Sequence, residues 1–119
     1  RPRAAYQWSV ETSVYVDERY RGCGLGRRLY TALFEVLIAQ GFANAYAGIA
    51  LPNPASVALH ERMGFRSIGV FQRVGYKRGE WWDVGWWHRP LSDATTAPSA
   101  PVPVTELLIR SEWAGLLKR

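Results

Sequence analysis

The chain has 119 residues, of which 48% are hydrophobic and 21% are charged, a composition typical of one globular domain and not of a disordered segment. No apolar run approaches the about 20 residues that a membrane-spanning helix needs, and no signal-peptide core follows the first residues. The single cysteine, Cys23, excludes an internal disulfide and is typical of a reducing compartment, so we expect a cytoplasmic protein with no membrane partner.

The charge is unevenly distributed along the chain, whose formal net charge is +5. Residues 1–91 hold twelve Lys and Arg against seven Asp and Glu, whereas residues 92–119 hold three of each kind. A basic balance suits an anionic partner such as nucleic acid, a membrane surface or a phosphate-bearing cofactor. A solvated basic surface explains the charge equally well, and the charge alone does not choose among these.

The first part of the chain predicts a strand, a loop, a helix and a second strand. Residues 10–16 are β-branched and aromatic with partial alternation, which predicts a strand, and the polar, glycine-rich residues 17–25 predict a loop. Apolar residues recur at helical spacing over residues 26–40, and Gly41 is expected to end that helix. Residues 43–51 are apolar and short enough for a buried strand.

The next part predicts a second helix and two further strands. The pair Asn53-Pro54 is typical of a helix start, with Asn as the N-cap, and the helix is expected over residues 54–63. Residues 65–74 and 81–89 predict two strands joined by a connection over residues 75–80.

Tryptophans mark the last of these strands. Alternation places Trp81 and Trp87 on one face, and Trp82 and Trp86 on the other. Aromatic residues on both faces indicate a strand that is covered on both sides, by the core or by a partner subunit. We therefore expect self-association through residues 81–89, as a homodimer.

The order of these elements predicts an α/β domain with a mixed sheet. The domain is expected to cover residues 1–91. Residues 92–103 are rich in Pro, Ala, Ser and Thr, which is typical of a linker. Residues 104–119 form a tail with a possible short helix.

The glycine-rich loop before the first helix is the most informative segment. It reads Arg21-Gly22-Cys23-Gly24-Leu25-Gly26-Arg27-Arg28. Glycines let the backbone approach a ligand, and a helix N-terminus attracts anions, so the loop suits a pyrophosphate. The spacing is neither that of a Walker A loop nor that of the dinucleotide-binding fingerprint. On the loop alone, an ordinary strand-to-helix turn is slightly favoured over a pyrophosphate site.

Four segments in chain order resemble the GNAT superfamily of N-acetyltransferases. Residues 11–26 resemble its acetyl-CoA signature, Arg/Gln-x-x-Gly-x-Gly/Ala after a strand, and residues 53–65 resemble its second motif. Residues 5–11 and 76–84 resemble the phosphinothricin and methionine sulfoximine acetyltransferases in particular. The resemblance implies a GNAT-type fold, with a mixed twisted sheet and helices on both faces.

The first strands and helices of that family have no counterpart here, and the chain begins without an initiator methionine. We therefore expect an N-terminally truncated domain. The resemblance supports its cofactor site more fully than a complete active site.

The resemblance implies that acetyl-CoA is the cosubstrate and that no metal takes part. The pantetheine arm is implied to pair with residues 14–16 as though it were an additional strand, and residues 21–26 are implied to hold the pyrophosphate. Asn53 is implied to contact the cofactor arm, although a plain N-cap role explains it equally well. The residues implied to contact acetyl-CoA are Val14, Tyr15, Val16, Arg21, Gly22, Cys23, Gly24, Leu25, Gly26, Arg27, Asn53 and Ser56.

The resemblance also implies roles in catalysis. Glu11 is the implied general base that deprotonates the attacking amine, and His60 the implied proton donor to the departing thiolate. Without the motifs, Glu11 would be read as a solvated residue and His60 as a structural one, as His88 is read here.

The implied reaction is direct transfer of acetyl to the amino group of a phosphinothricin-like or methionine-sulfoximine-like amino acid. The implied substrate residues are Arg1, Arg3, Tyr6 and Glu11. A non-catalytic acyl-CoA-binding remnant and a basic nucleic-acid-binding module remain as alternatives.

Overall fold

The structure, a computed structural model, describes residues 6–13, 24–93 and 97–108. Its elements in chain order are β1 (Ser9–Glu11), α1 (Leu25–Gln40), β2 (Asn44–Leu51), α2 (Pro54–Arg62), β3 (Arg66–Lys77), β4 (Glu80–Pro90) and α3 (Val104–Leu107). Among the described residues, no helix is both long and apolar enough to cross a membrane.

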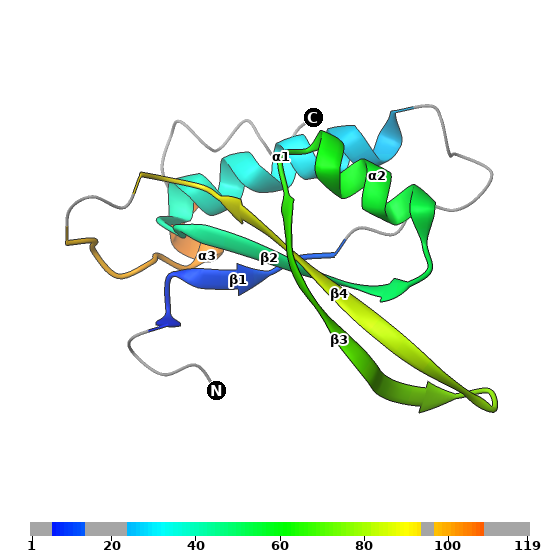
Figure 1. Cartoon of the computed structure of the whole chain (residues 1–119). Coiled ribbons are helices and arrows are strands. Elements are labelled where there is room, and N and C mark those ends of the chain that lie inside the picture. The colour runs from blue at the N-terminus through cyan, green and yellow to red at the C-terminus, as the bar shows by residue number, and fades with distance from the viewer. Residues whose placement is uncertain (1–5, 14–23, 94–96, 109–119) are drawn as a thin grey trace.

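The four described strands form one sheet in the order β1-β2-β4-β3. β1 runs parallel to β2, with Glu11 opposite Tyr46, and the other pairs are antiparallel. Figure 1 shows the sheet twisting beneath the two longer helices. The predicted α/β class and mixed sheet are confirmed.

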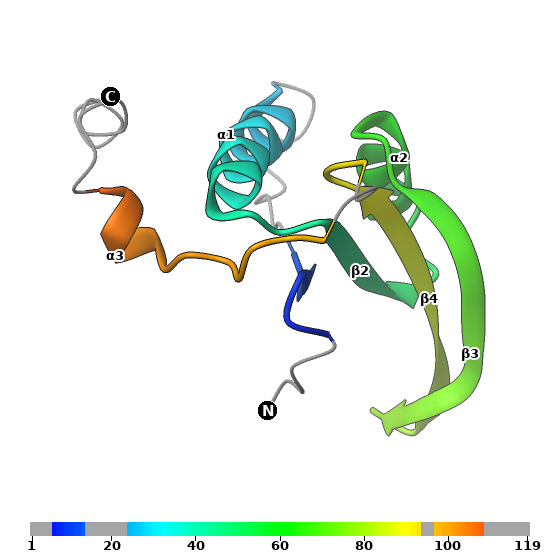
Figure 2. The ribbon, with the colours of Figure 1, turned by 90° about the vertical axis from the view of Figure 1, so that its left-hand side faces the viewer.

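The two helices α1 and α2 pack against one face of this sheet (Figure 2). Alternation along β2 turns Ala45, Ala47 and Ile49 toward this face, where each is at most 5% exposed. The rest of the buried cluster consists of Tyr30, Phe34, Leu37, Phe65, Trp87 and Leu91. The expected helices on both faces are therefore found on one face only, as far as the described residues extend.

The ends of both helices follow the predicted signals. α1 begins after Gly24, which has a φ of 83°, and ends at Gly41, whose φ is 100° and whose N–H donates to the carbonyls of Leu37 and Ile38. The N-cap of α2 is Asn53, whose Oδ1 accepts a hydrogen bond from the N–H of Ser56 at 3.2 Å.

β3 and β4 form a longer hairpin than expected, and it extends away from the helices (Figure 1). The predicted connection over residues 75–80 is a two-residue turn at Arg78 and Gly79, which have φ values of 56° and 78°. Two consecutive positive φ values suit the twist of a tight hairpin. Arginine is an unusual residue at the first position, so the sequence did not indicate this turn.

β4 lies between β2 and β3, with hydrogen-bonded partners on both sides. Residues 81–89 therefore offer no unpaired edge for the expected self-association. Within the described sheet the edge strands are β1 and β3. The predicted alternation does hold near the core, because Trp87 is 5% exposed on the helix side while Trp86 lines the opposite face.

Part of the predicted linker is held against the domain. The Trp8 indole donates to the carbonyl of Ser99 at 2.7 Å, and Gln40 exchanges two hydrogen bonds with the backbone of Val102, at 2.8 and 3.0 Å. Leu107 of α3 is 1% exposed, and α3 lies beside α1 (Figure 2). Residues 109–119 of the tail lie outside the described residues, and a domain boundary at residue 91 stays a prediction.

Gly85 of β4 is required by the packing of Trp87. A Cβ atom at this position would lie 2.6 Å from the Trp87 ring and 3.1 Å from Leu51. Gly85→Ala is therefore expected to lower the free energy of unfolding by about 1–3 kcal/mol, as overpacking of a core does. Gly75→Ala is the control, because a Cβ there meets no atom within 4 Å. Chemical denaturation of both variants checks this, and equal stabilities would contradict it.

Candidate functional site

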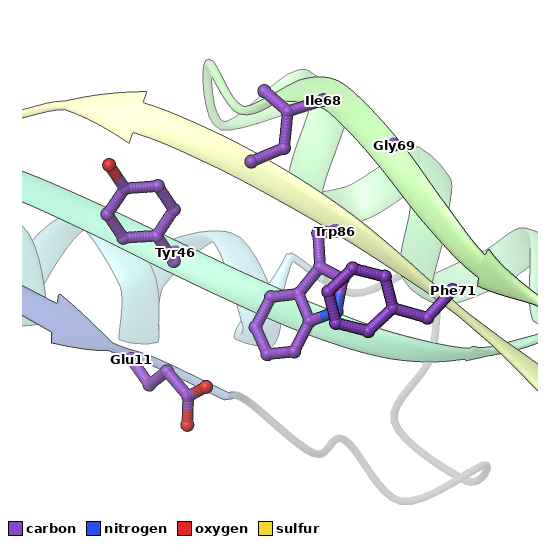
Figure 3. A pocket seen from close by; sticks show the side chains of 6 residues that line it. All are labelled: Glu11, Tyr46, Ile68, Gly69, Phe71 and Trp86. Carbon is purple, nitrogen blue, oxygen red and sulfur yellow. The ribbon is translucent and has the colours of Figure 1, made fainter. Parts of the chain in front are cut away.

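An open hollow of about 320 Å³ lies on the sheet face opposite α1 and α2. Residues of β1, β2, β3 and β4 line it, with one carboxylate among mostly apolar side chains (Figure 3). The lining residues are Glu11, Tyr46, Ile68, Gly69, Phe71 and Trp86.

Glu11 is the charged group of this pocket. It is the last residue of β1 and is exposed, opposite Tyr46 in the ladder. The Tyr46 ring stacks on His88 with their centroids 4.8 Å apart, and His88 is hydrogen-bonded to Asn44 at 2.8 Å. His88, which the sequence indicated as structural, thus supports a wall of the pocket. A carboxylate beside aromatic faces suits a cationic amine.

Trp86 and Phe71 form the opposite wall, with ring centroids 5.9 Å apart. Gly48 of β2 makes room for the indole, since a Cβ there would lie 2.9 Å from the Trp86 ring. Nε1 of Trp86 is buried and has no hydrogen-bond partner among the described residues. The sequence analysis did not assign this wall, although the tryptophans on both faces of the strand were its signal.

The N-terminus of α1 has the properties of an anion site. The first described intrahelical bond runs from Arg28 N–H to the carbonyl of Gly24, so the N–H groups of Leu25, Gly26 and Arg27 have no acceptor within the helix. The first turn carries no acidic residue, and Gly24 has no side chain to cover the helix end. These features fit the diphosphate of acetyl-CoA.

Several expected site residues lie outside the described residues. They are Arg1 and Arg3 of the substrate set, and Val14, Tyr15, Val16, Arg21, Gly22 and Cys23 of the cofactor set. Tyr6 is 64% exposed ahead of β1 and does not line the pocket. No group of three potential metal ligands occurs within the described ranges.

Asn53 and Ser56 lie at the start of α2. The N-cap uses only the Oδ1 atom of Asn53, so it is compatible with a ligand contact through the amide nitrogen. The carbonyl of Ser56 lies 2.8 Å from Nδ1 of His60, and its hydroxyl oxygen lies 3.4 Å from the same nitrogen.

His60 lies in the core on the helix side of the sheet and is 2% exposed. Its Nε2 is 2.7 Å from the hydroxyl of Tyr30, which lies 3.1 Å from the hydroxyl of Thr12. Burial raises the pKa of the Tyr30 phenol above its ordinary value of 10.0, while the hydrogen bond with Thr12 lowers it. Glu11 and His60 are therefore on opposite sides of the sheet. The sequence had not indicated that the Tyr30 hydroxyl contacts His60 and in turn the Thr12 hydroxyl.

Comparison with known proteins gives a consistent result. Residues 1–86 match the family model described as an acetyltransferase (GNAT) domain. A phosphinothricin N-acetyltransferase of Streptomyces coelicolor is 52% identical over 91 residues, which are 76% of this chain and 53% of that protein. A methionine sulfoximine/methionine sulfone acetyltransferase of Pseudomonas aeruginosa is 41% identical over 82% of this chain and 57% of its own.

Solved structures agree with these relatives. A phosphinothricin acetyltransferase of Sinorhizobium meliloti in complex with acetyl-CoA superposes with a TM-score of 0.77 at 38% identity, covering 86% of this chain and 56% of that one. The chain spans about half the length of the curated relatives it matches. By the match over residues 1–86, the chain belongs to the GNAT acetyltransferase family.

Proposed function

We propose that the protein is an N-acetyltransferase that transfers acetyl from acetyl-CoA to the amino group of an amino-acid-like substrate, of the phosphinothricin or methionine sulfoximine type. The observation that carries this proposal is the Glu11 carboxylate in an aromatic pocket, on the strand that precedes the N-terminus of α1. The relatives named above act on such substrates, which supports the substrate class.

The proposed acetyl-CoA site lies at the N-terminus of α1. The N–H groups of its first turn bind the diphosphate, and Arg21 and Arg27 neutralise part of its charge. The pantetheine arm follows residues 14–16, and Asn53 and Ser56 contact it from α2.

The chemical step needs a neutral amine, whose ordinary pKa lies above 7. Glu11 takes the amine proton, and the nitrogen then attacks the thioester carbonyl directly. The C–S bond breaks, and the departing sulfur receives a proton, the role expected of His60. Arg1 and Arg3 bind the acidic groups of the substrate, since arginine matches a carboxylate or phosphinate bidentately.

The two alternatives weighed from the sequence have no observation of the described residues in their favour. An acyl-CoA-binding remnant would bind the cofactor without turnover, and a nucleic-acid-binding module would show strongly salt-dependent binding. We also propose a cytoplasmic location and a homodimer.

Glu11→Gln tests the general base. It keeps the size of the side chain and removes the basic oxygen, so kcat is expected to fall by a factor on the order of 10² to 10⁴. Acetyl-CoA affinity is expected to stay nearly unchanged, because Glu11 is not assigned to the cofactor. The measurement is a pH–rate profile of the gene's complete product at saturating acetyl-CoA. Glu35→Gln, an exposed carboxylate on α1, is the control. Near-wild-type turnover of Glu11→Gln would place the base elsewhere.

Gly24→Val and Gly26→Val test the cofactor site. A side chain at either position occupies the space that the diphosphate needs, and at Gly24 it also strains a φ of 83°. Calorimetry is expected to show loss of most acetyl-CoA binding in both variants, with Gly75→Ala as the control. Thermal melting without ligand separates lost binding from lost folding. Folded variants with unchanged affinity would refute the assignment.

Self-association is expected through β3 and not through β4. Val74 and Tyr76 of this edge strand are 54% and 60% exposed, and an unpaired edge with apolar side chains favours pairing with a second copy. Val74→Lys is therefore expected to shift a dimer toward the monomer in light scattering at tens of micromolar. Leu29→Lys on α1 is the matched control, since Leu29 is 44% exposed away from the edge. A monomeric wild type would rule the dimer out.

A further inference from the structure

Three polar side chains form a continuous hydrogen-bonded chain through the core. Oγ1 of Thr12 lies 3.1 Å from the hydroxyl of Tyr30, which lies 2.7 Å from Nε2 of His60. Their exposed fractions are 9%, 0% and 2%. The neighbouring core positions are filled by apolar rings, Phe34 and Phe65, which contact Tyr30. Hydrogen bonding offsets the cost of burying these polar groups, and it links their protons in one continuous series from Thr12 to His60.

The His60 end of this hydrogen-bonded series has a fixed protonation pattern. Nδ1 of His60 lies 2.8 Å from the carbonyl of Ser56, which only accepts hydrogen bonds, so Nδ1 carries a proton in every state. When His60 is neutral, its Nε2 accepts from Tyr30, and Tyr30 accepts from Thr12. When His60 is an imidazolium, Nε2 donates to Tyr30, Tyr30 donates to Thr12, and the Thr12 hydroxyl points its proton outward.

The Thr12 end of this hydrogen-bonded series is adjacent in sequence to the proposed general base, Glu11. Thr12 follows Glu11 directly, and its N–H makes the last described bond of the β1–β2 ladder, to the carbonyl of Tyr46 at 2.9 Å. Successive residues of an extended strand point to opposite faces. Glu11 therefore faces the open pocket, while the hydroxyl of Thr12 faces the helices.

We infer that Thr12, Tyr30 and His60 form a proton relay for the departing thiolate, in which Tyr30 is the positioning residue through which His60 acts. The inference rests on the proposed function. As the C–S bond breaks, the sulfur takes the Thr12 proton, Thr12 takes the proton of Tyr30, and Tyr30 takes that of His60 Nε2. One proton leaves His60 and one arrives on sulfur, and both hydroxyl groups end as they began. The Nε2 proton of His60 is restored by the reverse route, when a solvent acid gives a proton to Thr12 and the two hydroxyl groups pass it back.

Tyr30 suits the middle of such a relay because it does not hold a charge. Burial raises the pKa of its phenol, so the tyrosinate is disfavoured at every pH at which the enzyme would work. The phenol gives one proton as it takes another. His60, whose two ring nitrogens are both engaged, then needs no direct contact with the sulfur.

The test uses single and double variants of the gene's complete product. Tyr30→Phe and Thr12→Val each remove one hydroxyl and keep most of the packing. Each is expected to lower kcat by about 10- to 100-fold at saturating acetyl-CoA, with the dissociation constant of acetyl-CoA within about twofold of wild type. Thr12→Ser keeps the hydroxyl and is expected to retain activity. Tyr76→Phe, on exposed β3, is the control.

The double variant and the pH profile separate a relay from a structural role. If the two hydroxyl groups act as one unit, Tyr30→Phe with Thr12→Val loses no more kcat than the worse single variant. The shape of the pH–rate profile is expected to change in both single variants, because the acid that protonates the sulfur no longer acts. A merely structural role would lower the melting temperature additively and leave the profile unchanged.

The outcomes also distinguish this inference from the proposed function. Turnover of wild type together with an unchanged kcat and pH profile in Tyr30→Phe overturns the relay alone. Absence of turnover in wild type, or full activity of Glu11→Gln, overturns the proposed mechanism and the relay with it.

Discussion

The side chain of Tyr30 holds the described part of this domain together. Its ring packs against Phe34, His60 and Phe65, with centroids 5.1 to 5.5 Å away, and it has no exposed surface. Its hydroxyl bonds to both Thr12 and His60, so one residue of α1 connects the end of β1 with α2. Removing the ring would separate three elements, whereas removing the hydroxyl would leave the packing and break only the polar connection. Few positions allow stability and chemistry to be tested separately in this way.

The sheet divides the proposed chemistry between its two faces. Glu11 and the aromatic walls lie on the open face, where a charged amine can enter from water. His60 and Tyr30 lie on the covered face, where they are 2% and 0% exposed. Acetyl transfer removes a proton from nitrogen and supplies one to sulfur, and this arrangement keeps the two operations apart.

Local signals predicted most of the fold, and tertiary contacts decided the rest. Gly41 and Asn53 mark helix ends through local capping interactions, which depend only on residues near them in the sequence. Those boundaries were therefore placed correctly. Strand order depends on contacts between distant residues, and the interior position of β4 was therefore missed. Glu11 and His60 were selected as candidates through their motifs, but no motif contains Thr12, Tyr30 and His60 together. Their separations of 18 and 30 residues are closed only by folding.

The hydrogen bonds that hold the proline-rich segment over residues 97–103 against the domain place few constraints on its sequence. On its own side, all three of the described bonds use backbone atoms, namely the carbonyls of Ser99 and Val102 and the N–H of Val102. The partners belong to the body of the domain: the side chain of Trp8, and both the side chain and the backbone carbonyl of Gln40. Substitutions along the segment would thus preserve its attachment, provided that its length is kept and residue 102 is not proline. Among related proteins the sequence of this segment would therefore vary while its position stayed the same. The requirement to hold the segment would be visible only as conservation of the residues that bind it, Trp8 and Gln40.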